Sequence, residues 1–181
     1  MKRIIAFFCV LVMSFTLVAC GDGANVSSGV TLASFQSVFE AYGSALHATE
    51  SEEGQVITCH MDGAPDVEIK LIRGRKRGVK QASIHSVEIV CQNANFALVE
   101  SEEKILAAIQ KDTLGKDELE VIQYFSLLKI LTEAVSGEKL GSDAVVAQLA
   151  GKTREKYEGW TVRVSKDKSA SALVLSAEFH P

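Results

Sequence analysis

The chain has 181 residues, 47% of them apolar, with 23 acidic and 19 basic side chains and a formal charge of −4. These figures exclude a disordered tail, a collagen-like repeat and a disulfide-dense mini-protein, and they fit one globular domain of roughly 100–200 residues. The averages combine two unlike parts. Residues 1–19 hold 15 apolar side chains, Lys2 and Arg3 but no acid, so the remaining 162 residues have a net charge of −6.

The first nineteen residues predict a secretory signal peptide. Lys2 and Arg3 form a positively charged start, and the apolar run 4–19 that follows is interrupted only by Ser14 and Thr16. This run is shorter than the roughly 20 residues that a membrane-spanning helix needs. Its length and flanks therefore favour an export signal over a permanent span.

The leader ends in Leu17-Val18-Ala19-Cys20, followed by Gly21. This ending resembles the lipobox of bacterial lipoproteins, and the resemblance covers the leader, Cys20 and Gly21. It implies cleavage after Ala19 and lipidation of Cys20, with a thioether-linked diacylglycerol and an acylated N-terminus that anchor the protein in membrane lipid. The alternative is an ordinary signal peptide in which Cys20 stands at this position by chance.

The same resemblance bears on localisation. In lipoproteins of enteric bacteria, an aspartate directly after the cysteine retains the protein at the inner membrane. Because Gly21 occupies that position here, the resemblance favours the periplasmic face of the outer membrane over the inner membrane. Residues 20–30 are rich in Gly and Ser and predict a flexible tether, which leaves residues 31–181 as a single globular domain.

The first element expected in this domain is an amphipathic helix over 31–49, because apolar residues recur there every three or four positions. Strand-like segments follow at 56–61, 67–73 and 79–91, with a turn at 74–78. Cys59 and Cys91 are the pair left after Cys9 and Cys20 are assigned to the leader and the lipid, and in an exported protein such a pair predicts a disulfide. Two buried free thiols are the alternative.

The disulfide and the strand pattern together favour one long β-ribbon. A three-strand meander with tight turns would leave Cys59 and Cys91 too far apart to bond, since disulfide-linked Cα atoms lie within about 7 Å. If 55–73 instead faces 77–92 with Arg73 opposite Arg77, the two cysteines lie directly opposite each other. This register places Lys70 opposite Lys80 and puts polar residues 81, 83 and 85 on the apolar face, so a change of register is expected near 81–85.

The remaining elements are three helices and a hairpin. Ser101 begins a second helix, 116–136 forms a long and largely buried third helix that stops at Gly137, and Ser142 and Gly151 bracket a short fourth. Alternating apolar residues over 160–179 predict a C-terminal hairpin. The fold class is therefore α+β, with an antiparallel sheet built from the disulfide-linked ribbon (55–92) and this hairpin, packed against about four helices.

Motifs for catalysis and for metal binding are weak. Ser-x-x-Lys recurs at unrelated places without its companion signatures, and Gly151-Lys152-Thr153 lacks the first glycine of a phosphate-binding loop. The four histidines share no helical or short metal-ligand spacing. We therefore expect no catalytic residue, no cofactor and no metal, and the protein is predicted not to be an enzyme.

The charge pattern gives the one functional candidate. Residues 20–69 contain eight acids and no Lys or Arg, whereas 70–80 is strongly basic and contains no acid. The candidate partner-binding residues at the turn are Arg73, Arg75, Lys76, Arg77 and Lys80. Side chains that fan out from a hairpin tip can bind an envelope protein or an anionic ligand; the alternative is a solvated, charged turn that prevents edge-to-edge aggregation. Nucleic acid is disfavoured by net charge and location.

These features predict a membrane-anchored envelope lipoprotein that binds or assists another envelope component. A ligand-binding or enzyme-inhibiting protective lipoprotein is the alternative, and it predicts an apolar pocket or a protruding loop.

Overall fold

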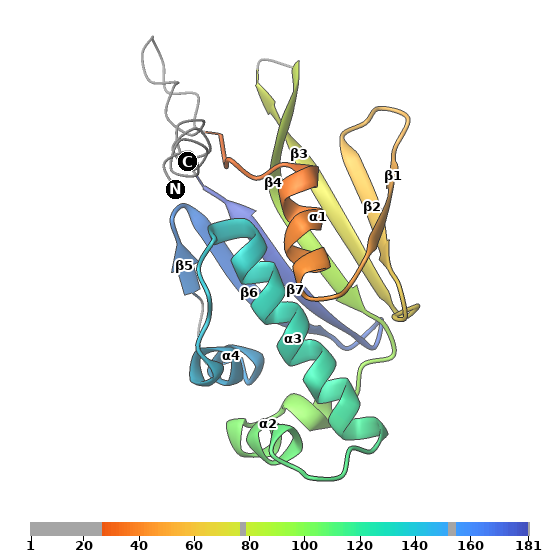
Figure 1. Ribbon diagram of the computed structural model, residues 1–181, viewed down its shortest axis with the longest axis vertical. Coiled ribbons are helices and arrows are strands. Elements are labelled where there is room, and N and C mark those ends of the chain that lie inside the picture. Colours follow the sequence, from red (N-terminus) through yellow and green to blue (C-terminus); the bar gives the residue numbers. More distant parts are fainter. Residues whose placement is uncertain (1–26, 77–78, 152–154, 181) are drawn as a thin grey trace, which may run out of the picture.

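The computed structural model describes residues 27–76, 79–151 and 155–180. Within these residues the fold is α+β, with one seven-stranded antiparallel sheet in the order β1-β2-β3-β4-β7-β6-β5 and helices on one of its faces (Figure 1). The strands are β1 (Leu46–Glu50), β2 (Val56–Met61), β3 (Val67–Lys76), β4 (Val79–Cys91), β5 (Glu155–Tyr157), β6 (Trp160–Asp167) and β7 (Ala172–Phe179). The helices are α1 (Leu32–Ala41), a 3₁₀ turn η1 (Phe96–Val99), α2 (Glu102–Ile109), α3 (Lys116–Ser136) and α4 (Ser142–Leu149).

The two faces of the sheet differ in composition. Along β4, Val87, Ile89 and Cys91 point to the helices and are buried, while Ser86 and Glu88 alternate with them and remain partly exposed. The same alternation runs through β7. An antiparallel sheet with one packed and one solvated face has this pattern, and the core therefore lies between the sheet and α1, α3 and α4.

The boundaries predicted from the sequence for the second, third and fourth helices are confirmed. The Ser101 hydroxyl accepts a hydrogen bond from the Lys104 amide and caps α2. Helix α3 covers the expected 116–136 and ends at Gly137, whose φ of 75° is the left-handed conformation that glycine adopts readily. Both signals act within one turn of the helix end, which is why the sequence alone locates them.

The expected helix over 31–49 is too long. Helix α1 ends at Ala41, Gly43 has a φ of 80°, and Leu46 begins β1, which pairs with β2. The apolar spacing that suggested a continuous helix belongs to two elements, because Phe35 and Phe39 face the core from α1 whereas Leu46 faces it from a strand. Pairing with the neighbouring strand outweighs the weak helical preference of this segment.

The long β-ribbon is wrong, and so is the disulfide. β2 and β3 are separate antiparallel strands joined by a turn in which Gly63 has a φ of 74°. Cys59 lies opposite Ile69, and Cys91 lies opposite Val67. Two strand spacings of about 4.8 Å and an offset of two residues place the cysteine Cα atoms about 12 Å apart. Both cysteines are free and buried.

The β3–β4 register also differs from the register expected for the ribbon. Its pairing is Val67 with Cys91 near the base of the hairpin and Arg75 with Lys80 near the tip, with irregularities on both sides of Arg73. These bulges lie opposite 80–86, where the polar residues interrupt the alternation. The pairing at the tip, Lys76 with Val79, already differs from the expected pairing of Arg73 with Arg77, and the bulges shift the register further, so that Lys70 lies opposite Glu88 rather than opposite Lys80.

The chain joins the domain before α1 begins. The Ile84 amide in β4 donates to the Val30 carbonyl at 2.7 Å, and Ser28 donates its hydroxyl to the Ile84 carbonyl. Val30 is buried. Residues 28–30 therefore lie against the upper part of β4, close to the β3–β4 hairpin.

Candidate functional site

The basic hairpin expected from the sequence is formed by β3 and β4. Arg73, Arg75 and Lys76 lie in β3, and Lys80 lies in β4 opposite Arg75. Arg77 and the side chains of Lys76 and Lys80 lie outside the described residues. Among the candidate residues, the side chains of Arg73 and Arg75 are the ones whose contacts the structure describes.

Arg73 binds within the protein. Its guanidinium donates to both carboxylate oxygens of Glu50, at 2.7 and 3.0 Å, and to the Gly54 carbonyl at 2.9 Å. The hydrogen bond and charge of Glu50 raise the pKa of Arg73 above its already high ordinary value. Only 13% of the Arg73 side chain is exposed. Its role is to hold the end of β1 and the β1–β2 turn against β3.

Arg75 is exposed and only loosely held. One terminal nitrogen lies 3.4 Å from a carboxylate oxygen of Glu53, which belongs to the β1–β2 turn. Two of the acidic residues that precede the basic stretch in sequence, Glu50 and Glu53, thus face it in space. Arg73 is bound to Glu50 and is therefore not available to an external ligand. Of the two arginines, Arg75 is the one whose positive charge can interact with a ligand.

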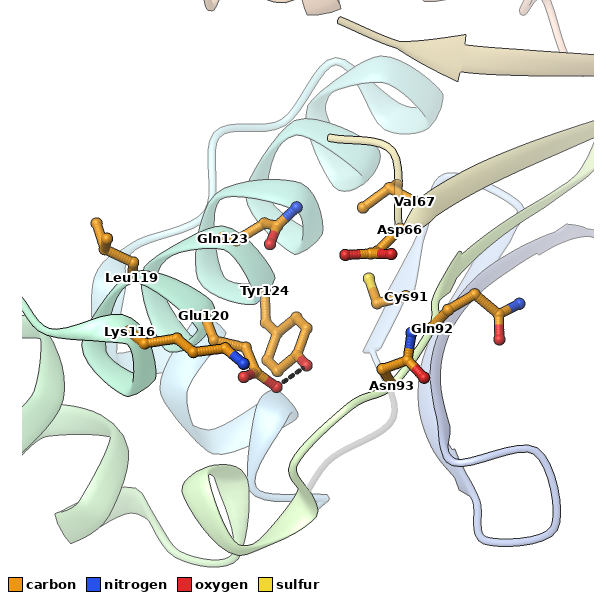
Figure 2. A pocket seen from close by; sticks show the side chains of 10 residues that line it. All are labelled: Asp66, Val67, Cys91, Gln92, Asn93, Lys116, Leu119, Glu120, Gln123 and Tyr124. Atoms are coloured by element: carbon orange, nitrogen blue, oxygen red, sulfur yellow. Dashed lines mark hydrogen bonds between the residues drawn. The ribbon is translucent and has the colours of Figure 1, made fainter. Parts of the chain in front are cut away.

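A pocket of about 240 Å³ lies at the opposite end of β4 from this hairpin. Figure 2 shows the side chains that surround it, from α3 on one side and from the start of β3 and the end of β4 on the other. The Tyr124 hydroxyl donates to Glu120, and the Asn95 amide donates to the same carboxylate oxygen at 2.8 Å. Glu120 therefore fixes both the tyrosine and the loop that follows β4.

The thiol in this pocket is not activated. Burial, reinforced by the charge of Glu120, raises the pKa of Cys91 to about 12. Burial and the hydrogen bond to Glu120 likewise raise the pKa of Tyr124 far above its ordinary value. Cys59, in β2, has its pKa raised to about 11 by burial. Nucleophilic cysteines need the opposite shift, so both thiols are protonated core groups at neutral pH.

A second and more open pocket of about 570 Å³ lies between η1, α2 and the first turns of α3. Ala97, Leu98 and Ala108 form part of its lining, and Lys104 and Lys111 lie at its edge. Its volume is in the range of small-molecule sites. Sequence patterns do not predict this pocket, because its walls come from three elements whose relative placement depends on the tertiary structure.

The structure also brings together two of the four histidines. His47 in β1 lies directly opposite His60 in β2, a contact hidden from the sequence by the overlong helix assigned to 31–49. Among the described residues, no group of three or more His, Cys, Asp and Glu side chains is placed so that it could hold a metal ion. Nor does the described part of the chain contain a helix long and apolar enough to cross a membrane.

Comparison with known proteins finds no protein-family model, no curated protein and no solved structure that matches the chain. The functional argument therefore rests on the residues and on their geometry.

Proposed function

We propose that the protein is an exported bacterial envelope lipoprotein, anchored by lipid at Cys20 on the periplasmic face of the outer membrane, which binds or assists another envelope component without catalysing a reaction. The observation that carries the proposal is the Leu17-Val18-Ala19-Cys20 sequence at the end of a basic and apolar leader. Two or more acyl chains give stable attachment because each buried CH₂ contributes about 0.8 kcal/mol.

The point where the chain joins the domain supports a contact made close to the membrane. Seven residues, 21–27, separate Cys20 from Ser28, and even fully extended they span at most about 25 Å. Ser28 is hydrogen-bonded to Ile84, and the five residue steps from Ile84 to Val79 cover about 17 Å of β4 towards the hairpin tip. A lipid anchor and a basic hairpin separated by such short lengths of chain can engage the same membrane-proximal partner.

The proposed contact surface comprises Arg75, Lys76, Arg77 and Lys80. Arg73, the fifth member of the sequence-based set, is bound to Glu50 and Gly54 and contributes by holding the β1–β2 turn. An acidic face of an envelope protein is the partner that complements this charge.

The anchor is tested with Cys20→Ser and, as a matched control in the same leader, Cys9→Ser. We expect the unmodified chain and the Cys9→Ser variant to partition into the detergent phase and to carry the mass of a lipidated N-terminus. Cys20→Ser should lose both properties. Lipid on the Cys20→Ser variant, or an unmodified Cys20 in the parent protein, contradicts the proposal.

The contact is tested by replacing Arg75, Lys76 and Arg77 together with alanine. A control triple of exposed lysines away from the hairpin is Lys139→Ala, Lys156→Ala and Lys168→Ala. In-cell crosslinking should lose its specific products in the hairpin variant and keep them in the control, with equal amounts of anchored protein. Identical products from both variants would show that the hairpin is only a solvated turn.

The pocket between η1, α2 and α3 favours a ligand-binding lipoprotein as a second candidate function. Its size and partly apolar lining suit a small amphiphilic molecule. Native mass spectrometry of the protein purified from its host should then show a bound mass that disappears in Ala108→Trp, where the larger side chain fills the pocket. A spectrum without bound mass in the parent protein removes this candidate.

A further inference from the structure

The pocket beside Tyr124 is not used by the proposed envelope contact. It lies between the first turns of α3 and the two chain segments that enter β3 and leave β4 (Figure 2), at the end of β4 away from the basic hairpin. Its volume of about 240 Å³ is below the roughly 300–1,000 Å³ of sites that take drug-sized molecules. A ligand of this pocket is therefore small, of about the size of a free amino acid.

Hydrogen bonds within the protein fix the two walls of the pocket. On the α3 side, the buried Tyr124 donates its hydroxyl to Glu120, which also accepts the Asn95 amide at 2.8 Å. On the opposite side, the Gln92 amide donates to the Asp66 carbonyl at 2.8 Å and joins the loop before β3 to the residue after β4. Because both walls are held in place, a ligand loses little affinity to the ordering of the protein.

Unpaired charges of both signs line the pocket. The Asp66 carboxylate belongs to the loop that leads into β3, and the Lys116 ammonium belongs to the first residue of α3. Neither side chain makes an ion pair or a hydrogen bond within the described part of the chain. The polar lining is completed by the side-chain amides of Gln92, Asn93 and Gln123. The pocket therefore offers one cation, one anion and several amide groups to a ligand.

The arrangement of the charges gives the pocket a positive and a negative part. The start of a helix carries partial positive charge, so a carboxylate bound by Lys116 at the start of α3 meets positive potential from both. One turn further along α3 lies the Glu120 carboxylate, and the Asp66 carboxylate lies across the pocket from it (Figure 2). These two carboxylates favour an ammonium group.

We propose that this pocket binds a small zwitterion of the amino-acid type, with its carboxylate at Lys116 and its ammonium group at Asp66. An anion without an amine is repelled by Asp66 and Glu120, and an amine without a carboxylate leaves Lys116 unpaired, so neither matches the lining as well. The apolar part of the lining comes from Val67 and Leu119. It favours an aliphatic side chain on the ligand.

The exposure of Leu119 supports the same class of ligand. Its side chain is 53% exposed, and it is the one large apolar residue of α3 that is exposed. A ligand side chain that packs on Leu119 removes apolar area from water, which favours binding. Glycine, which has no side chain, should therefore bind more weakly than leucine.

Calorimetry on the full chain, purified in detergent, tests the ligand class with matched probes. L-leucine is the zwitterion, L-leucinamide lacks the carboxylate, N-acetyl-L-leucine lacks the ammonium group, and glycine lacks the side chain. We expect L-leucine to bind saturably, one molecule per chain. The other three probes should bind about fivefold more weakly or worse, because each lacks one of the contacts.

The two charges are tested with Asp66→Asn and Lys116→Gln, which remove one charge each and nearly keep the size of the side chain. Both residues are exposed, so both variants should fold, and thermal unfolding without ligand checks this. Each should weaken L-leucine binding about fivefold. Asp112→Asn and Lys168→Gln are the matched controls, because these residues are exposed and do not line the pocket. They should leave the affinity unchanged.

Amide NMR locates the bound probe independently of affinity. L-leucine should shift the side-chain amide signals of Asn93 and Gln123, which line the pocket. The signal of Gln148 should not move, because this side chain is buried in α4 and donates to the Val162 carbonyl at 3.1 Å.

A parent chain that binds none of L-leucine, L-valine and L-methionine overturns the proposal. So does equal affinity for L-leucinamide or N-acetyl-L-leucine, or full L-leucine affinity in Asp66→Asn or Lys116→Gln. NMR shifts confined to the pocket between η1, α2 and α3 refute the assignment to this site. None of these measurements depends on the lipid at Cys20, so failure of the zwitterion site and failure of the envelope role are distinguishable.

Discussion

Arg73→Ala is expected to destabilise the domain, although the residue belongs to a stretch that looks like a binding surface. The substitution removes the two hydrogen bonds to Glu50 and the one to the Gly54 carbonyl. Glu50 is 45% exposed, so solvent screens the ion pair and we assign it about 1 kcal/mol. The bond to the buried Gly54 carbonyl adds about 1 kcal/mol.

The total of about 2 kcal/mol corresponds to a fall in melting temperature of about 4–8 °C for a domain of this size. Thermal unfolding followed by circular dichroism measures it. Arg75→Ala is the control, because it removes the same side chain two residues along β3, where the contact to Glu53 is exposed at both ends. That variant should stay within about 0.5 kcal/mol of the parent protein.

An Arg73→Ala variant that melts within one or two degrees of the parent protein, or an Arg75→Ala variant that is equally destabilised, would contradict this prediction. Either result would mean that the β1–β2 turn is not held by Arg73. Part of the Arg73 effect should also disappear at about 1 M salt, where screening acts over about 3 Å.

Three further outcomes follow from buried or paired groups. Alkylation should leave Cys59 and Cys91 unmodified in the native protein and label both in denaturant without a reductant; a disulfide-linked peptide pair would refute the strand register. Leu128→Ala should cost about 2–5 kcal/mol in urea unfolding, since the side chain is fully buried, and a smaller loss would mean that α3 packs differently. The Lys111 ammonium and the Gly115 amide hold the pKa of Glu118 below its usual range, so its stabilising effect is present above the ordinary carboxyl pKa and is lost as pH falls through the lowered one. Glu118→Gln should therefore flatten the acid side of the stability profile, and an unchanged profile would contradict this role.

The sequence by itself determined the features that depend on neighbouring residues. Ser101 marks the start of α2 and Gly137 marks the end of α3, and the Leu17–Cys20 segment is the basis of the lipoprotein proposal. The C-terminal hairpin was also predicted, because period-two alternation of apolar residues directly reflects which side chains face the core. The α+β class followed from the order of these elements.

Only the tertiary structure decided which strands pair and in which register. The disulfide required Cys59 to face Cys91, but a short turn at Gly63 reverses the chain and places Ile69 opposite Cys59. Parity identifies the buried face of a strand; it does not identify the strand that lies beside it. For the same reason β1 was assigned to an expected helix, and the pairing of His47 with His60 was not predicted. This pairing exists because β1 adds to the edge of the sheet beside β2.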